Sequence, residues 1–238
     1  ECAQMLMNAK ADINAFSGLG VTPLMLATLT GSADVQRLLD SNADVDASDN
    51  DGETALIWAV RLGKTQCAQL LINAQADIEV WDSIFGCTPL LWAAEKGRTD
   101  CVMLLLDAKA ELEAKDNERL TPLMLAAADG HAQCTQLLID SKADLEATEE
   151  SNYTALMIAV SCDHAECAQL LIDAKADVDA EDDRGVTSVL LAVEGGSTKC
   201  GKLLITANAN IEAEDDTGRT ALRLAVSDNQ PEFVELLI

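Results

Sequence analysis

The strongest constraint on the fold of this chain is a motif that returns about every 33 residues. An apolar block that begins with threonine, such as TPLMLA, TALIWA or TALMIA, is followed by a second block such as CAQLLI or CTQLLI. Successive threonines are 32, 34, 33, 33, 33 and 33 residues apart, at Thr22, Thr54, Thr88, Thr121, Thr154, Thr187 and Thr220. Repetition at this period predicts stacked repeats, each of which contacts only its neighbours, instead of one central core.

Each repeat is predicted to hold two short helices. The threonine can accept a hydrogen bond from an unpaired N–H at a helix start, and Pro23, Pro89 and Pro122 follow it at the first helical position, where proline is favoured. The apolar residues of both blocks fall on one helical face. Between the blocks stands a glycine that can close the first helix with a positive φ, at Gly31, Gly63, Gly97, Gly130 and Gly196.

The stretch that links one repeat to the next is predicted to be extended and then to turn. Examples are ADVDASDNDGE and ADVDAEDDRGV, in which Asp, Asn and Gly supply the residues that turns prefer. We interpret these stretches as projecting fingers.

These features resemble the ankyrin repeat family, whose period is 33 residues and whose signature is T-P-L-H-x-A. The resemblance covers nearly all 238 residues and recurs seven times. It implies an all-α solenoid of stacked antiparallel helix pairs with β-turn fingers, and a concave groove formed by fingers and first helices. It also implies one ankyrin-repeat domain over residues 1–238, with partial repeats at 1–15 and 214–238 and full repeats at 16–47, 48–81, 82–114, 115–147, 148–180 and 181–213.

Two departures from the family pattern matter. The histidine after T-P-L is replaced, so we expect apolar packing in place of its hydrogen bonds, at Met25, Ile57, Leu91, Met124, Met157, Leu190 and Arg223. The glycine before the A-D pair is also replaced, at Lys10, Asn42, Gln75, Lys109, Lys142, Lys175 and Asn208. If those positions keep a left-handed backbone, a lysine there carries strain of about 1 kcal/mol.

The eight cysteines could form disulfides, hold a metal or fill the core. Six share one position of the repeat, where Val35 and Phe233 stand in other repeats, namely Cys2, Cys67, Cys101, Cys134, Cys167 and Cys200. Exchange with apolar residues indicates a buried position, and a one-repeat separation of roughly 8–10 Å is too long for a disulfide. Cys87 and Cys162 lie outside this column and are predicted to be exposed thiols. Unpaired thiols in this number favour a reducing, intracellular and cytoplasmic location.

No catalytic, metal or cofactor site is predicted. The chain has no C-x-x-C, no phosphate-binding glycine loop and no nucleophile motif, and His131 and His164 stand alone. The acids recur with the repeat, so we interpret them as turn and capping residues, at Asp44, Asp77, Glu111, Asp144 and Asp177. The sequence therefore predicts a protein that is not an enzyme and has no cofactor.

A formal net charge of −25 argues against binding nucleic acid or an anionic membrane. The basic residues are scattered singly, and no basic patch offsets the negative field. The remaining class of function is recognition of another protein.

Aromatic residues in the fingers are the candidates for such recognition. Phe16, Trp81, Phe85 and Tyr153 fall in fingers, whereas Trp58, Trp92 and Phe233 occupy helix positions that suggest the core. The finger WDSIFGC is one residue longer than the others and brings Trp81, Ile84 and Phe85 together. Apolar anchors within a polar rim are typical of a binding hot spot, although Trp81 could instead pack on the next finger.

The predicted groove has two halves. An apolar N-terminal half would hold Leu29, Leu62, Trp81, Ile84, Phe85 and Leu120. An acidic C-terminal half would attract a basic segment through Glu150, Glu181, Asp183, Glu194, Glu214 and Asp216. The full set of predicted partner-binding residues is Leu29, Arg61, Leu62, Trp81, Ile84, Phe85, Lys96, Leu120, Tyr153 and Arg184.

We therefore expect a non-catalytic protein-interaction module, such as a scaffold or adaptor, whose partner offers a basic and apolar segment. Two alternatives stay open: the targeting arm of a larger intracellular enzyme or effector, and a structural subunit of a larger assembly. The sequence starts and stops within predicted second helices that lack a polar cap, so end-to-end self-association or fraying is also expected.

Overall fold

The helices of the chain come in pairs, one pair in each repeat. The computed structural model describes residues 12–238. In that part of the chain the first helices of the pairs are α2 (Pro23–Thr30), α4 (Ala55–Arg61), α6 (Pro89–Glu95), α8 (Pro122–Ala128), α10 (Ala155–Ser161), α12 (Ser188–Glu194) and α14 (Ala221–Ser227). The second helices are α3 (Ser32–Asp40), α5 (Thr65–Asn73), α7 (Thr99–Asp107), α9 (Ala132–Asp140), α11 (Ala165–Asp173), α13 (Thr198–Thr206) and α15 (Pro231–Leu237). The predicted all-α solenoid of helix pairs is confirmed.

The repeated threonine begins the first helix, as predicted. In six of the seven described repeats its hydroxyl accepts from the N–H three residues later, for example from Met25 to Thr22 at 3.3 Å. The exception is Thr187, whose hydroxyl is buried with no hydrogen-bond partner among the described residues. The helix start is therefore set by a local side-chain bond that the sequence motif already carries.

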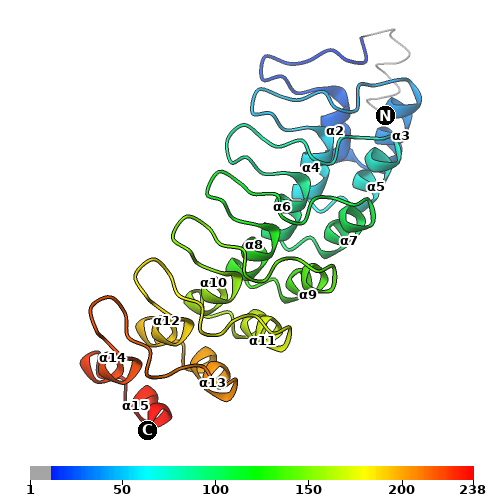
Figure 1. Ribbon diagram of the computed structural model, residues 1–238. Coiled ribbons are helices and arrows are strands. Elements are labelled where there is room, and N and C mark those ends of the chain that lie inside the picture. Colours follow the sequence, from blue (N-terminus) through cyan, green and yellow to red (C-terminus); the bar gives the residue numbers. More distant parts are fainter. Residues whose placement is uncertain (1–11) are drawn as a thin grey trace. The chain divides into compact units, whose positions relative to one another are not determined.

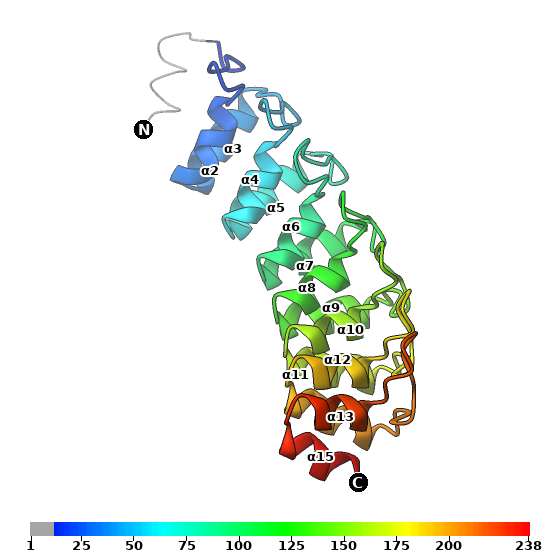
Figure 2. The same cartoon turned by 90° about the vertical axis from the view of Figure 1, so that its left-hand side faces the viewer.

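The described chain divides into two compact units, the first ending at Asn117 and the second starting at Glu118. In the first unit α2 packs on α4 and α4 on α6, while α3 packs on α5 and α5 on α7. In the second unit α8, α10, α12 and α14 pack in that order, and α9, α11, α13 and α15 pack in the same way. Within each unit the fingers extend from the same side of the helices, as Figures 1 and 2 show.

Hydrogen bonds join each finger to the next within a unit. In the first unit the N–H of Asn50 donates to the carbonyl of Leu19 at 3.0 Å, and in the second the N–H of Asp216 donates to the carbonyl of Arg184 at 2.8 Å. Recurring acids brace the start of several fingers in short Asx turns, as at Asp77, whose carboxylate accepts from the N–H of Glu79 at 2.9 Å. The turn role predicted for Asp44, Asp77, Asp144 and Asp177 is confirmed.

The non-glycine residues before the A-D pair do adopt a left-handed backbone. Their φ values lie between 61° and 75°, at Asn42, Gln75, Lys109, Lys142, Lys175 and Asn208. Lys10 lies outside the described residues. Left-handed conformations cost free energy for residues other than glycine, so these positions hold strain that stacking must offset.

Apolar packing replaces the family's histidine, as expected. Met25, Ile57, Leu91, Met124, Met157 and Leu190 are all buried. Arg223 is exposed, and its Nη1 donates to the carbonyl of Gly218 at 3.3 Å.

The cysteine column is buried, as predicted, and the described cysteines are free thiols. Cys2 lies outside the described residues. The prediction for Cys87 was wrong, because its residue is only 2% exposed. Its N–H donates to the buried carboxylate of Asp82 at 3.0 Å, which folds this end of the finger inward. Cys162 is exposed, as expected.

Thiol labelling should separate these two cysteines. Burial, with a smaller contribution from nearby acids of which Asp116 is the largest, raises the pKa of the Cys87 thiol to about 12. Because the thiolate is the reactive form, iodoacetamide at pH 8 is expected to modify Cys162 first and to leave Cys87 unmodified until the protein unfolds. Peptide mass spectrometry over time measures both rates. Equal rates in the folded protein would contradict the buried position of Cys87.

Candidate functional site

The finger formed by residues 81–87, called here the aromatic finger, exposes three large apolar side chains. Trp81 is 66% exposed, Ile84 55% and Phe85 53%. Beneath them the Oδ1 of Asp82 accepts from the N–H groups of Ile84 at 3.0 Å and Phe85 at 2.7 Å. Hydrogen bonds to the buried carboxylate of Asp82 thus fix the backbone of this lengthened finger and position its apolar tip without a partner.

Behind the aromatic finger lies a packed cluster around Trp92, whose residue is 3% exposed. The Phe85 ring meets the Trp92 ring edge to face with centroids 5.6 Å apart. The Arg61 guanidinium lies 4.4 Å from the Trp92 ring centroid and the Lys96 Nζ lies 5.3 Å from it. Cations over a tryptophan face are attracted to its π-electrons, by about 0.5–2 kcal/mol each.

Both cations are also paired with carboxylates. Arg61 forms an ion pair with Glu53, and Lys96 pairs with Glu95 at 2.6 Å. Burial raises the pKa of Glu53, and Arg61 acts against that rise. The indole Nε1 of Trp92 donates to the Oδ2 of Asp82 at 3.0 Å, which links the cluster to the aromatic finger.

The second unit has a cavity of about 460 Å³. Its walls come from the last residue of α8, the middle of α10, the residue before the Thr121 cap and two further fingers, and include Leu120, Ala128, Ile158, Tyr153 and Arg184. Three predicted partner-binding residues, Leu120, Tyr153 and Arg184, therefore line one cavity. Leu120 was grouped with the apolar N-terminal residues, but here it belongs with Tyr153 and Arg184.

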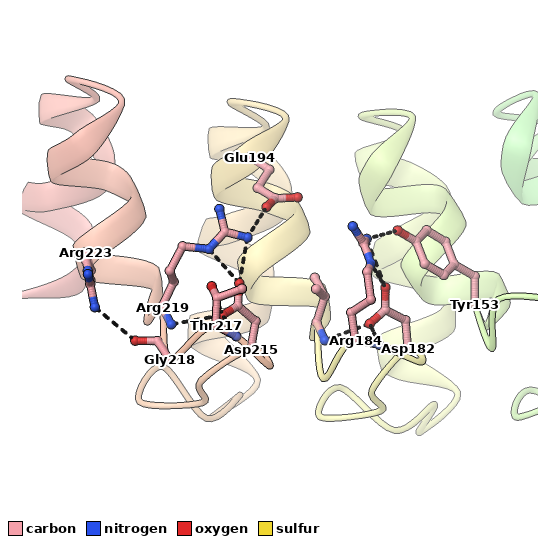
Figure 3. Close-up of polar contacts among 10 residues, drawn as sticks. Tyr153, Asp182, Arg184, Glu194, Asp215, Thr217, Gly218, Arg219 and Arg223 are labelled. Atoms are coloured by element: carbon pink, nitrogen blue, oxygen red, sulfur yellow. Dashed lines mark hydrogen bonds and ion pairs between the residues drawn. The ribbon is translucent and has the colours of Figure 1, made fainter.

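Buried carboxylates hold Arg184 and Arg219 of the second unit in place, as Figure 3 shows. Asp182 Oδ2 accepts from Arg184 Nε at 3.1 Å and Nη2 at 3.0 Å, and that Nη2 also donates to the Tyr153 hydroxyl at 3.3 Å. Burial raises the pKa of Tyr153, so its phenol stays protonated and can donate a hydrogen bond near neutral pH.

The next finger repeats this arrangement. Asp215 accepts from Arg219 Nε at 2.7 Å, and Arg219 also reaches Glu194 at 3.3 Å. The backbone N–H of Arg219 and further donors from Thr217 hold the pKa of Asp215 well below its ordinary value. The carboxylates are thus structural acceptors, and Arg184 and Arg219 are fixed at the surface.

Other predicted site residues lie apart from these two clusters. Leu29 and Leu62 are exposed at the ends of α2 and α4, and Phe16 is exposed in the first described finger. Trp92 and Phe233 are core residues as predicted, whereas Trp58 is half-buried and donates from Nε1 to Asp49 at 3.2 Å.

Comparison with known families decides the classification. The family model for ankyrin repeats (3 copies) matches residues 1–82, 35–116, 74–149, 90–182 and 175–238. The chain belongs to the ankyrin repeat family. Its structure is similar to the crystal structure of the ankyrin repeat domain of Bcl-3, a member of the IkappaB protein family, with 26% sequence identity and a TM-score of 0.82. That similarity covers 92% of this chain and 98% of the other.

A search of curated protein sequences gave no match for this ankyrin repeat chain. None of the helices between residues 12 and 238 is long and apolar enough to cross a bilayer.

Sequence reasoning missed the carboxylate column of this ankyrin repeat protein. Asp49, Asp82, Asp182 and Asp215 each stand five or six residues before a repeated threonine and accept hydrogen bonds from their own finger. The signal was visible as an acid at a constant place in the repeat. What it could not show is that Asp82, Asp182 and Asp215 are buried and Asp49 is half-buried, while acids beside them such as Asp51, Asp183 and Asp216 are exposed.

Proposed function

We propose that this ankyrin repeat protein is a non-catalytic interaction module, a scaffold or adaptor, that binds a protein partner with its fingers and first helices. The observation that carries the proposal is the aromatic finger, which exposes Trp81, Ile84 and Phe85 on a chain of net charge −25. Exposed apolar clusters of this kind favour association, and tryptophan is enriched among residues that dominate binding energy.

The partner is proposed to offer an apolar segment and a basic one. The apolar segment would bury the aromatic finger, and the exposed acids of the second unit would attract the basic segment. Those acids include Glu150, Glu181, Asp183, Glu214 and Asp216. Because such charges act mainly on encounter, added salt is expected to slow association more than it speeds dissociation. Free thiols in the described chain support a reducing compartment as its location.

The test is a double variant, Trp81→Ala with Phe85→Ala. Partners are captured from a native lysate by wild type and variant in parallel and quantified by mass spectrometry. Loss of two hot-spot side chains should lower the affinity for a specific partner at least about tenfold.

A matched control is Phe16→Ala with Leu19→Ala, which removes two exposed apolar side chains from another finger of the same unit. A specific partner should be lost only with the Trp81/Phe85 variant. Equal losses from both variants, or retention by both, would mean that the aromatic finger does not anchor the partner.

A further inference from the structure

The two units use equivalent positions of the repeat differently. In the first unit Trp92, Phe85 and Arg61 form the packed cluster described above. Counted from the repeated threonines, the equivalent residues of the second unit are Ile158, Ser151 and Ala128. Each of the three is smaller, and all three line the cavity of about 460 Å³. The cavity is therefore the place that an indole fills in the first unit.

Asp82, the acid that accepts a hydrogen bond from the Trp92 indole, also has an equivalent residue in the second unit. In the first unit the Trp92 Nε1 donates to Asp82 Oδ2. The equivalent acid of the second unit is Glu149, which lines the cavity. Its Oε1 accepts from the N–H groups of Ser151 at 2.9 Å and Tyr153 at 3.0 Å. Among the described residues no donor contacts its Oε2, so one acceptor is available at the cavity wall.

The remaining walls suit an aromatic ring. Leu120, Ala128 and Ile158 are half-buried apolar surfaces. Arg184, held by Asp182 and Tyr153, places a fixed guanidinium at the rim, as Arg61 lies over Trp92 in the first unit. Cavities of this size are typical of sites that enclose a drug-sized group. An acidic ligand is disfavoured, because three carboxylates, Glu149, Asp182 and Asp183, already line the cavity.

We propose that this cavity binds a tryptophan side chain of a protein partner, whose indole N–H donates to Glu149 and whose ring lies between Ile158, Leu120 and Arg184. The proposal deepens the proposed function and rests on it. The partner's indole ring would occupy the place that the indole of Trp92, on α6, occupies in the first unit.

The experiment uses N-acetyl-L-tryptophanamide, which is uncharged, in an NMR titration of the full isotope-labelled chain. We expect saturable shifts at the backbone amides of Ala128, Ser151 and Tyr153 with a Kd of about 1 mM. N-acetyl-L-phenylalaninamide has no indole N–H and should bind at least about fivefold more weakly. Absence of saturable shifts at these amides up to about 10 mM, or equal binding of the two probes, overturns the proposal.

Two variants of one residue complete the test. Ile158→Trp should fill the cavity from within and weaken probe binding more than about tenfold, while Ile158→Val should keep it. Tryptophan already stands at this position of the repeat in Trp58 and Trp92, and far-UV circular dichroism checks that each variant folds. An unchanged Kd in the Ile158→Trp variant overturns the site. The probe assay needs no natural partner, so its outcome is independent of the capture experiment on the aromatic finger.

Discussion

Asp82→Ala is expected to destabilise the first unit by about 3 kcal/mol or more. The Asp82 carboxylate is buried and accepts from the N–H groups of Ile84, Phe85 and Cys87 and from the Trp92 indole. Hydrogen bonds to a charged group contribute about 1.5–3 kcal/mol each, and removing the acceptor leaves buried donors unsatisfied. The three tryptophans all belong to the first unit, so tryptophan fluorescence during urea unfolding measures the loss there.

The same substitution should also disorder the aromatic finger and so reduce partner capture. Asp51→Ala is the matched control, because Asp51 is exposed and its carboxylate accepts no hydrogen bond from the described residues. Exposed substitutions of this kind change stability by less than about 0.5 kcal/mol. If both variants unfold at the same urea concentration, the buried carboxylate does not hold this finger.

Gly201→Ala is expected to destabilise the second unit by about 1–3 kcal/mol, although alanine is ordinarily the better helix former. A methyl group at Gly201 would overlap the ring of Phe233, which packs against it from α15. The residues equivalent to Gly201 include Ala68 and Ala168. In those two cases the next repeat has a cysteine, Cys101 or Cys200, at the position that Phe233 occupies. Glycine at 201 and phenylalanine at 233 thus share one volume of the core.

A double-mutant cycle tests this shared volume. Phe233→Cys alone removes most of a buried ring and should cost about 3 kcal/mol. In that background Gly201→Ala should change sign and stabilise by up to about 1 kcal/mol, since the clash is gone and the helix gains propensity. Circular dichroism during thermal unfolding gives each corner of the cycle. A penalty for Gly201→Ala of the same size in both backgrounds would show that the two residues do not compete for space.

The sequence by itself determined the helices, their pairing within each repeat and the family. The physical reason is that these features depend on short stretches: the cap at Thr54, the proline at Pro89 and apolar residues on one helical face. Left-handed positions such as Lys109 could be predicted from register alone, because each repeat forces the same turn. The lengthened finger also predicted that Trp81 and Phe85 meet at one tip, but it left open whether Trp81 packs on the next finger, and the structure shows both side chains exposed.

Only the tertiary structure decided which residues of separate repeats meet. Cys87 is buried because Asp82 draws its end of the finger inward, and Arg61 lies over Trp92 although 31 residues separate them. The cavity beside Ile158 exists because small residues from several segments coincide there. A repeat motif fixes the backbone through local bonds, but filled and open space depends on side-chain volumes brought together from different repeats.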